Sequence, residues 1–266
     1  MGGDIKQLRG RIRSVDSTLH LTKAMGLVAS SKLRRAMEAM QASRTHTEAL
    51  SATARTLSAF PTCRRSVFLT EREGGRTLLA VIAGDRGMAG GYNAGVFRLL
   101  SETPHDEVIA IGRRACDRLG TQARSAERFP YAEARELAET ICRRFAAGEI
   151  DRFVILSTRY DSMLSQTPEL IPVLPLLCDG EAGGDALFEP SPEAVLNALI
   201  PQYVAGMLYG AVRESFACEV AARRVAMDNA GKNATEMIEA LTLQYNRARQ
   251  SAITQEITEI VAGSGG

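Results

Sequence analysis

The sequence contains no tryptophan, and aromatic residues make up only 5% of its 266 residues. This is little for a compact β-sandwich or for a protein that stacks nucleic-acid bases on aromatic rings. The net charge of +1 gives no compositional reason to expect binding to nucleic acid or to an anionic membrane. The length is sufficient for a sizeable hydrophobic core in one large domain or two small ones.

Cysteines are few and widely spaced, and an apolar targeting segment is missing. The five cysteines include no CxxC pair, which argues against a disulfide framework and a zinc site and suits a reducing cytoplasm. They are Cys63, Cys116, Cys142, Cys178 and Cys218.

The N-terminal segment lacks the apolar region of a signal peptide. We also expect no segment to be apolar over the ~18 residues of a membrane span, so membrane association would depend on a partner.

Proline is absent from both ends of the chain. All nine prolines lie between Pro61 and Pro201. Because proline removes an N–H donor and clashes with the preceding helical turn, the proline-free ends predict two long helices around a globular insert. We place an N-terminal helix at 1–60, an inserted α/β domain at 61–193 and a C-terminal helix at 194–266, with its main run at 202–262.

The first of these helices has a heptad pattern. Its seam positions are Ile5, Leu8, Ile12, Val15, Leu19, Thr22, Gly26, Ala29, Leu33, Ala36, Met40, Ser43, Thr47, Leu50, Ala54 and Leu57, of which twelve are apolar. A repeat of 3.5 residues predicts a left-handed supercoil with another helix. Asp4 can cap the start, and Phe60-Pro61 ends a helix of about 80 Å.

The C-terminal helix carries a similar seam. It consists of Met227, Gly231, Ala234, Ile238, Leu241, Tyr245, Ala248 and Ala252. The two helices should be antiparallel, since the insert must begin and end near one end of the pair. Small residues on both seams predict a close approach of the backbones. Two amphipathic helices of an ordinary bundle remain the alternative.

The N-terminal helix is basic. Residues 4–58 contain ten Lys and Arg against four acidic residues, a net charge of +6. A basic helix can bind nucleic acid, lie in an acidic protein sleeve or simply face solvent, and composition does not separate these possibilities.

The middle of the chain alternates between strand and helix patterns. Predicted strands cover Thr77–Ala83, Glu107–Ile111 and Arg152–Ser157, and predicted helices cover 92–103, 113–119 and 132–147. Pro168–Leu177 is predicted as an edge strand and Cys178–Pro192 as a surface linker. The alternation predicts a parallel, doubly wound, Rossmann-like sheet.

A glycine-rich turn, Gly84–Asn93, follows the first predicted strand, where phosphate-binding loops occur. It matches neither GxGxxG nor the GK[ST] ending of a Walker A loop, so a turn with positive φ angles and close helix–strand packing is the preferred interpretation. His20, His46 and His105 lie far apart in the sequence, and no nucleophile–base set is visible. We predict no catalytic centre, no cofactor and no metal site.

Three segments resemble signatures of the gamma subunit of F-type ATP synthases. They are Leu21–Met25 with Val28–Ala36, the turn Gly84–Asn93, and Gln244–Val261. The resemblance extends over the whole chain in the same order. It implies a long antiparallel coiled coil that rotates inside a ring of alpha and beta subunits, with the insert against the epsilon subunit and the membrane c ring.

The resemblance implies that ATP chemistry takes place on the alpha and beta subunits. It also implies peripheral attachment at the cytoplasmic face of a bacterial membrane, reached only through partners, and no nucleic acid. Arg249, Gln250, Thr254 and Glu256 match family positions that touch a beta-subunit loop. Met25 and Arg223 match positions near the coupling region, and Lys23, Arg247, Thr258 and Glu259 match positions linked to coupling or helix contact. Gly26 and Ala89 depart from the family pattern, where a longer residue and a cysteine are usual.

Two other classes stay open from the sequence. A nucleotide-dependent α/β enzyme with helical arms would bind a nucleotide tightly as an isolated chain. A nucleic-acid-binding rod would show steeply salt-dependent binding through residues 6–55.

Overall fold

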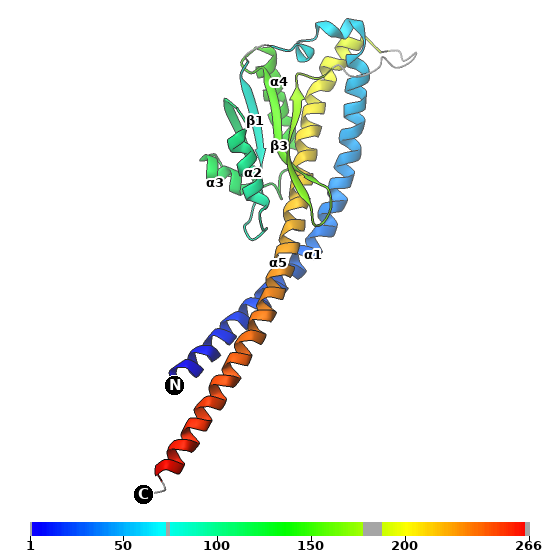
Figure 1. Ribbon diagram of the computed structural model, residues 1–266. Helices are drawn as coiled ribbons and strands as arrows, with labels where there is room; N and C mark the ends of the chain where they lie inside the picture. The colour runs from blue at the N-terminus through cyan, green and yellow to red at the C-terminus, as the bar shows by residue number, and fades with distance from the viewer. Residues whose placement is uncertain (1, 73–74, 178–187, 264–266) are drawn as a thin grey trace. The chain divides into compact units, whose positions relative to one another are not determined.

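The computed structural model describes residues 2–72, 75–177 and 188–263 (Figure 1). The chain divides into two compact units. The terminal unit contains Met1–Ala29 and Arg223–Gly266, and the central unit contains Ser30–Ala222. Helix α1 (Gly2–Ser58) and helix α5 (Pro192–Gly263) contribute to both units.

The predicted seams are confirmed. Each of the sixteen seam positions of α1 and each of the eight of α5 is buried or half-buried. Helix α1 ends at Ser58, and the N–H of Phe60 then donates to the carbonyl of Leu57 over 3.1 Å. Pro61 begins the short 3-10 helix η1 (Pro61–Arg65), so the stop signal acts where the sequence places it.

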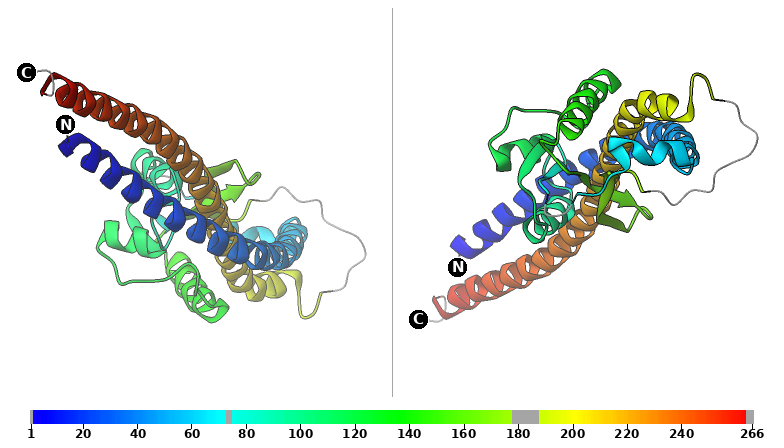
Figure 2. Two further views of the ribbon diagram at one scale, coloured as in Figure 1. Left: turned by 90° about the horizontal axis from the view of Figure 1, so that it is seen from below. Right: turned by 90° about the horizontal axis from the view of Figure 1, so that it is seen from above.

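Within the terminal unit the two helices run antiparallel, side by side in both views of Figure 2. Arg9 donates to the hydroxyl of Tyr245 over 2.9 Å. Further along α1, Gly26 faces Met227 on α5. The partner number falls as the α1 number rises, which is the antiparallel order predicted from the position of the insert.

Within the central unit the helices approach closely through small residues. Thr47 Oγ1 lies 3.1 Å from the carbonyl oxygen of Gly206 and donates to it. A Cβ added at Gly210 would lie only 2.8 Å from the same Thr47 oxygen. Ala36 and Met40 pack against Ala217. This segment of α5 therefore needs glycine or alanine where it faces α1.

The C-terminal helix begins two residues before the predicted start at 194, and it is already continuous before the main run predicted at 202–262. Helix α5 begins at Pro192 and continues through Pro201, which the sequence analysis treats as a boundary. Leu196, Ile200 and Val204, on either side of this proline, are fully buried in the main core. Their burial offsets the ~3 kcal/mol that an internal proline costs a helix.

The expectation that no segment reaches the hydropathy of a membrane span is also wrong. Helix α5 contains an 18-residue window of mean hydropathy 1.3, and half of that window is buried within the structure. A core helix meets the same criterion as a span, because it too must present apolar side chains in several directions. The buried residues of α5 that pack in the main core explain the composition of this window.

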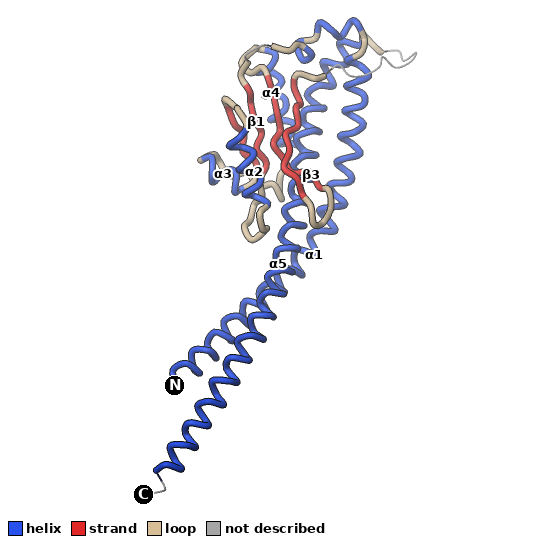
Figure 3. The backbone as a smooth tube through the Cα atoms, in the orientation of Figure 1, coloured by secondary structure: helices blue, strands red, loops and turns tan. Residues whose placement is uncertain are grey.

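Four strands form one sheet in the order β2-β1-β3-β4 (red in Figure 3). They are β1 (Thr77–Ile82), β2 (Glu107–Ile111), β3 (Arg152–Tyr160) and β4 (Gln166–Leu174). Strand β1 pairs in parallel with both β2 and β3, as predicted. Strand β4 is an edge strand, also as predicted, but it pairs antiparallel to β3, so the sheet is mixed. The link between β3 and β4 is too short for the crossover that a parallel pair needs.

The sheet separates two hydrophobic cores. Leu78, Ala80 and Ile82 of β1 belong to a core shared with α1, α4 (Tyr131–Ala146) and α5. The alternate residues Leu79 and Val81 belong to a second core with α2 (Tyr92–Glu102) and α3 (Arg113–Leu119). The strand is thus apolar on both faces, as a strand covered by helices on both sides must be.

The remaining expectations concern the linker and the cysteines. Residues 178–187 of the predicted linker, including Cys178, lie outside the described residues. The four described cysteines are buried. Burial raises the pKa of Cys142 to about 12, which suppresses its thiolate form.

Two glycine substitutions in the long helices should have opposite effects. A Cβ at Gly26 would meet Met227 Cβ and Asp228 Oδ1 at 3.7 Å, which is ordinary contact, so Gly26→Ala should raise the free energy of unfolding by about 1 kcal/mol. Gly210→Ala should lower it by about 1 kcal/mol, because it displaces Thr47. Thermal unfolding followed by circular dichroism measures both, and shifts of the same sign would contradict this account.

Candidate functional site

The residues predicted to make subunit contacts all lie in the terminal unit. Met25 and Arg223 are half-buried, and the other eight are exposed: Lys23, Arg247, Arg249, Gln250, Thr254, Glu256, Thr258 and Glu259. Gly26 faces Met227, which lies one helical turn from Arg223, so Met25 and Arg223 lie at the same level of this unit. The remaining contact candidates on α5 are spread along its last turns.

Several polar side chains near the end of α5 already have partners in their own helix. The hydroxyls of Thr254 and Thr258 donate to the carbonyls of Gln250 and Thr254, over 3.0 and 2.8 Å. Gln255 donates to Glu259 over 2.8 Å. These side chains already have hydrogen-bond partners within their own helix. A partner protein that touches them therefore need not supply directional hydrogen bonds.

The end of α5 also exposes large apolar side chains that the sequence analysis did not single out. All of residues 253–263, here called the tip segment, are exposed. Ile257 is 57% and Ile260 70% exposed, and Ile253 and Val261 are exposed as well. Their spacing of four, three and one residues places them on one side of the helix. An apolar stripe of this kind on an otherwise uncovered helix marks a surface for a protein partner.

A second constellation lies in the central unit, at the turn Gly84–Asn93. The carboxylate of Asp85 is 9% exposed and accepts four hydrogen bonds. Oδ1 accepts from the backbone N–H groups of Arg113 and Ala126, both at 3.0 Å. Oδ2 accepts from the hydroxyl of Ser125 at 2.6 Å and from the N–H of Glu127 at 2.9 Å. Asp85 thereby fixes the turn to the start of α3 and to the loop before α4.

These bonds determine the charge state of Asp85. Burial by itself raises the pKa of a carboxyl group. Here the hydrogen bonds from Ser125 and from the N–H groups of Glu127, Arg113 and Ala126 outweigh burial, and the pKa of Asp85 is lowered from its ordinary value of 3.8. Asp85 is therefore ionised at neutral pH.

The same turn is held on α5 by a second buried carboxylate. Glu219 is 1% exposed, and its two oxygens accept from the N–H groups of Asp85 and Arg86 at 3.0 and 3.1 Å. A Cβ added at Gly84 would lie 2.8 Å from Cδ of Glu219, so only glycine permits this approach. Met88 and Gly90 adopt positive φ angles of 58° and 57°. The interpretation of the motif as a structural turn is confirmed.

This geometry disfavours a phosphate-binding loop. The N–H groups of Asp85 and Arg86, which such a loop would direct at a phosphate, donate to the carboxylate of Glu219. The N–H of Tyr92 at the start of α2 donates to the carbonyl of Ala89 over 3.2 Å. A phosphate here would meet two carboxylates in a site of low dielectric.

Arg213 of α5 completes the attachment of the loop before α4. Its guanidinium donates to the carbonyls of Ala126 at 2.6 Å, Phe129 at 3.1 Å and Glu127 at 3.4 Å. The side chain of Glu127 in turn pairs with Lys32 of α1 at 2.5 Å and with Arg86 at 3.6 Å. We call this set of contacts among Lys32, Asp85, Glu127, Arg213 and Glu219 the joint. No local sequence pattern reveals the joint, because its members are far apart in the chain.

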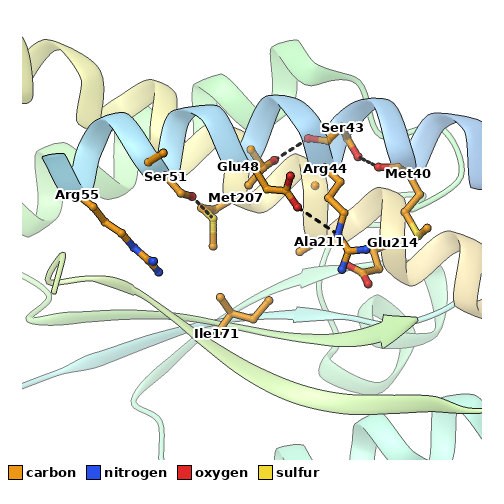
Figure 4. Close-up of a pocket in the computed structure, with 13 residues that line it drawn as sticks. Met40, Ser43, Arg44, Glu48, Ser51, Arg55, Ile171, Met207, Ala211 and Glu214 are labelled. Atoms are coloured by element: carbon orange, nitrogen blue, oxygen red, sulfur yellow. Dashed lines mark hydrogen bonds and ion pairs between the residues drawn. The ribbon is translucent and has the colours of Figure 1, made fainter. Parts of the chain in front are cut away.

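A groove of about 390 Å³ lies among α1, α5 and β4 in the central unit (Figure 4). Its lining includes Arg44, Glu48, Met207 and Glu214. Arg44 pairs with Glu48 at 3.7 Å, and Glu214 accepts from the N–H of Tyr160 at 2.9 Å.

Over residues 2–72, 75–177 and 188–263, no three His, Cys, Asp or Glu side chains gather as a metal site would require.

Asp85→Asn should destabilise the protein in a pH-dependent way. The amide would place an NH2 donor against N–H groups, so the free energy of unfolding at pH 7 should fall by about 3 kcal/mol. Because the folded pKa of Asp85 is lowered, its stabilisation is present above pH 3.8 and is lost as pH falls through the lowered pKa. The deficit should therefore shrink on acidification.

Urea unfolding between pH 7 and pH 3 measures this difference, with Glu139→Gln on the exposed face of α4 as the control. A deficit that stays constant over this range would contradict an ionised Asp85 as its source.

Comparisons with known proteins agree with the fold. A family model described as ATP synthase matches residues 4–265. The ATP synthase gamma chain of Ruminococcus albus is 40% identical over 280 residues, covering 98% of this chain and 98% of that protein. The sodium ion specific ATP synthase gamma chain of Acetobacterium woodii is 35% identical and covers 99% of each chain.

Solved structures show the same architecture. The match in the rotor of Euglena gracilis mitochondrial ATP synthase has a TM-score of 0.69 at 21% identity, covering 95% of this chain and all of the other. At that identity the match supports the fold, and the curated relatives carry the assignment. Because the family model matches residues 4–265 and these relatives are 35–40% identical over nearly the whole length of both chains, this chain belongs to the ATP synthase gamma chain family.

Proposed function

We propose that the chain is the central rotating stalk subunit of an F-type ATP synthase. In this role it couples ion-driven rotation of the membrane c ring to ATP synthesis or hydrolysis on the alpha/beta hexamer. The observation that carries the proposal is the similarity to ATP synthase gamma chains at 35–40% identity over nearly the full length. The exposed apolar stripe of the tip segment supports it independently, because a rotating shaft needs an end that seats in a partner.

The tip segment has the chemistry of a bearing surface. Ile253, Ile257, Ile260 and Val261 offer apolar contact, which is non-directional and so tolerates rotation. Thr254 and Thr258 keep their hydroxyls bonded to their own helix. A ring of alpha and beta subunits with an apolar inner wall fits such a surface without fixing one orientation.

The contact positions taken from the family resemblance supply the specific contacts in this proposal. Arg249, Gln250, Thr254 and Glu256 would meet a loop of the beta subunit in one rotational state. Met25 and Arg223 would lie near the coupling region, with Lys23, Arg247, Thr258 and Glu259 in coupling or helix contact. The net charge of +6 on residues 4–58 would meet acidic loops, where charge steering acts without a locked pairing.

The chain itself would be non-catalytic. We propose that residues 1–60 and 194–266 act as the shaft, and that the insert at 61–193 contacts the epsilon subunit and the c ring. The protein would attach peripherally to the cytoplasmic face of the cell membrane, through these partners alone and without nucleic acid.

Co-purification tests the proposal. The tagged chain, isolated from its native membranes, should bring alpha and beta subunits with ATPase activity. Deletion of residues 245–266 should abolish coupled activity, because it removes the tip segment. Recovery of the chain alone, or with nucleic acid, would contradict the proposed role.

A charge in the apolar stripe should weaken seating of the tip. Ile257→Asp should lower the affinity for the alpha/beta hexamer about tenfold or more, because a carboxylate would be buried in an apolar wall. Ser251→Asp adds the same charge on another side of the helix and should change affinity little. Titration of reconstituted hexamer with each variant measures this, and equal losses would show that the stripe is not the seated face.

A further inference from the structure

We propose that Glu219 is the residue through which the insert drives α5, so that torque enters the shaft through the buried contacts of Glu219 on α5 rather than through the ion pair of Glu127 with Lys32 on α1. This inference rests on the proposed rotor function. It assigns a positioning role to a residue outside the contact positions suggested by the family resemblance.

The geometry of Glu219 suits the transmission of force. Each of its two oxygens accepts a different backbone N–H, from Asp85 and from Arg86. A carboxylate held by two backbone donors resists displacement of the turn relative to α5, because movement of the turn would stretch these bonds. Backbone N–H groups are also held more rigidly than the end of a long, flexible side chain, so they transmit a displacement more directly. The close approach at Gly84 leaves no space for the turn to move toward the helix.

The force on Glu219 is distributed over the insert by Asp85. Asp85 belongs to the turn that Glu219 holds, and its own carboxylate binds the start of α3 and the 125–127 loop. Arg213, on α5 as well, binds the carbonyls of that loop. The β1–α2 turn, α3 and the loop before α4 are therefore tied to one helix.

A second set of contacts involves Ser215, one helical turn before Glu219, and Cys218, the residue next to it. The hydroxyl of Tyr92 donates to the carbonyl of Ser215 at 2.9 Å, and the hydroxyl of Ser215 accepts from the N–H of Thr158 at 3.1 Å. Cys218 donates to the carbonyl of Thr158 at 3.4 Å. Positions 215, 218 and 219 share one face of α5. The end of β3 and the β1–α2 turn are thus both fixed to that face.

The ion pair that reaches α1 is of a different kind. Lys32 pairs with Glu127 at 2.5 Å, but the two side chains are 37% and 28% exposed. A partly exposed pair is screened by solvent and is held by the long, flexible stem of lysine. It can follow small movements of the insert without transmitting them. Loss of Lys32 should therefore matter little, whereas loss of Glu219 should loosen the insert.

Hydrogen exchange in the full-length chain tests the joint itself. Glu219→Gln leaves one oxygen and places an NH2 donor against an N–H, so the amides of Asp85 and Arg86 should exchange about tenfold faster or more. Tyr92→Phe, a milder change that removes the neighbouring hydrogen bond to Ser215, should accelerate exchange at the end of β3 and in the turn to a smaller degree. Glu139→Gln on α4 should leave these amides unchanged.

Single-molecule rotation of the assembled complex tests the transmission of torque. A probe attached through Glu102→Cys, exposed at the end of α2, in a Cys178→Ser background, reports the angle of the insert while the hexamer is stalled. Glu219→Gln should broaden the angular distribution, and Lys32→Ala and Glu139→Gln should match the wild type. Where Glu219→Gln fails to assemble, Tyr92→Phe should show the broadening.

The outcomes separate the two proposals. Wild-type chain that does not assemble with alpha and beta subunits would overturn the rotor function and, with it, the torque path. Normal assembly, with distributions for Glu219→Gln and Tyr92→Phe as narrow as the wild type, would overturn the role of Glu219 alone. Broadening by Lys32→Ala equal to that by Glu219→Gln would also overturn it, because torque would then enter through α1 as well.

Discussion

Close packing of α1 against α5 through small side chains is the constraint on which the rest of the structure depends. In the central unit, Gly206 and Gly210 bring α5 near enough for Thr47 to bond a backbone carbonyl of the other helix. In the terminal unit, Gly26 and Gly231 also face the other helix, but at distances that leave room for a methyl group. Neither long helix has a wide apolar face. A close approach lets each helical turn bury much of its narrow apolar seam against the other helix, and the pair needs this contact.

The insert is attached to this helical pair by polar contacts as well as by its core. Burial of Asp85 and Glu219 is costly unless every oxygen is bonded, and backbone N–H groups meet that requirement here. Such an arrangement is specific in a way that apolar packing is not, because a shift of the turn by one residue would leave both carboxylates unpaired. The unusual backbone conformation of the glycine-rich turn is thus explained by the attachment of the insert to α5 and not by phosphate binding.

The tip segment shows the opposite design. Its apolar residues are left exposed and its threonines bond their own helix, so this end is suited to contacts made and released repeatedly. A rigid attachment of the insert and a non-directional surface at the tip are the two properties that a rotating shaft requires. Both occur on α5.

Much of the architecture followed from the sequence, because periodicity and proline placement act locally. The seam from Ile5 to Leu57 and strands β1 and β2 were predicted nearly residue by residue, since a heptad repeat or a short apolar run needs no knowledge of its partner. The direction of β4 and the passage of α5 through Pro201 were decided by tertiary packing, which outweighed local preference. The joint could not be predicted at all. Asp85 and Glu219 are 134 residues apart, and only the folded chain brings the N–H groups of the turn to the carboxylate that orders them.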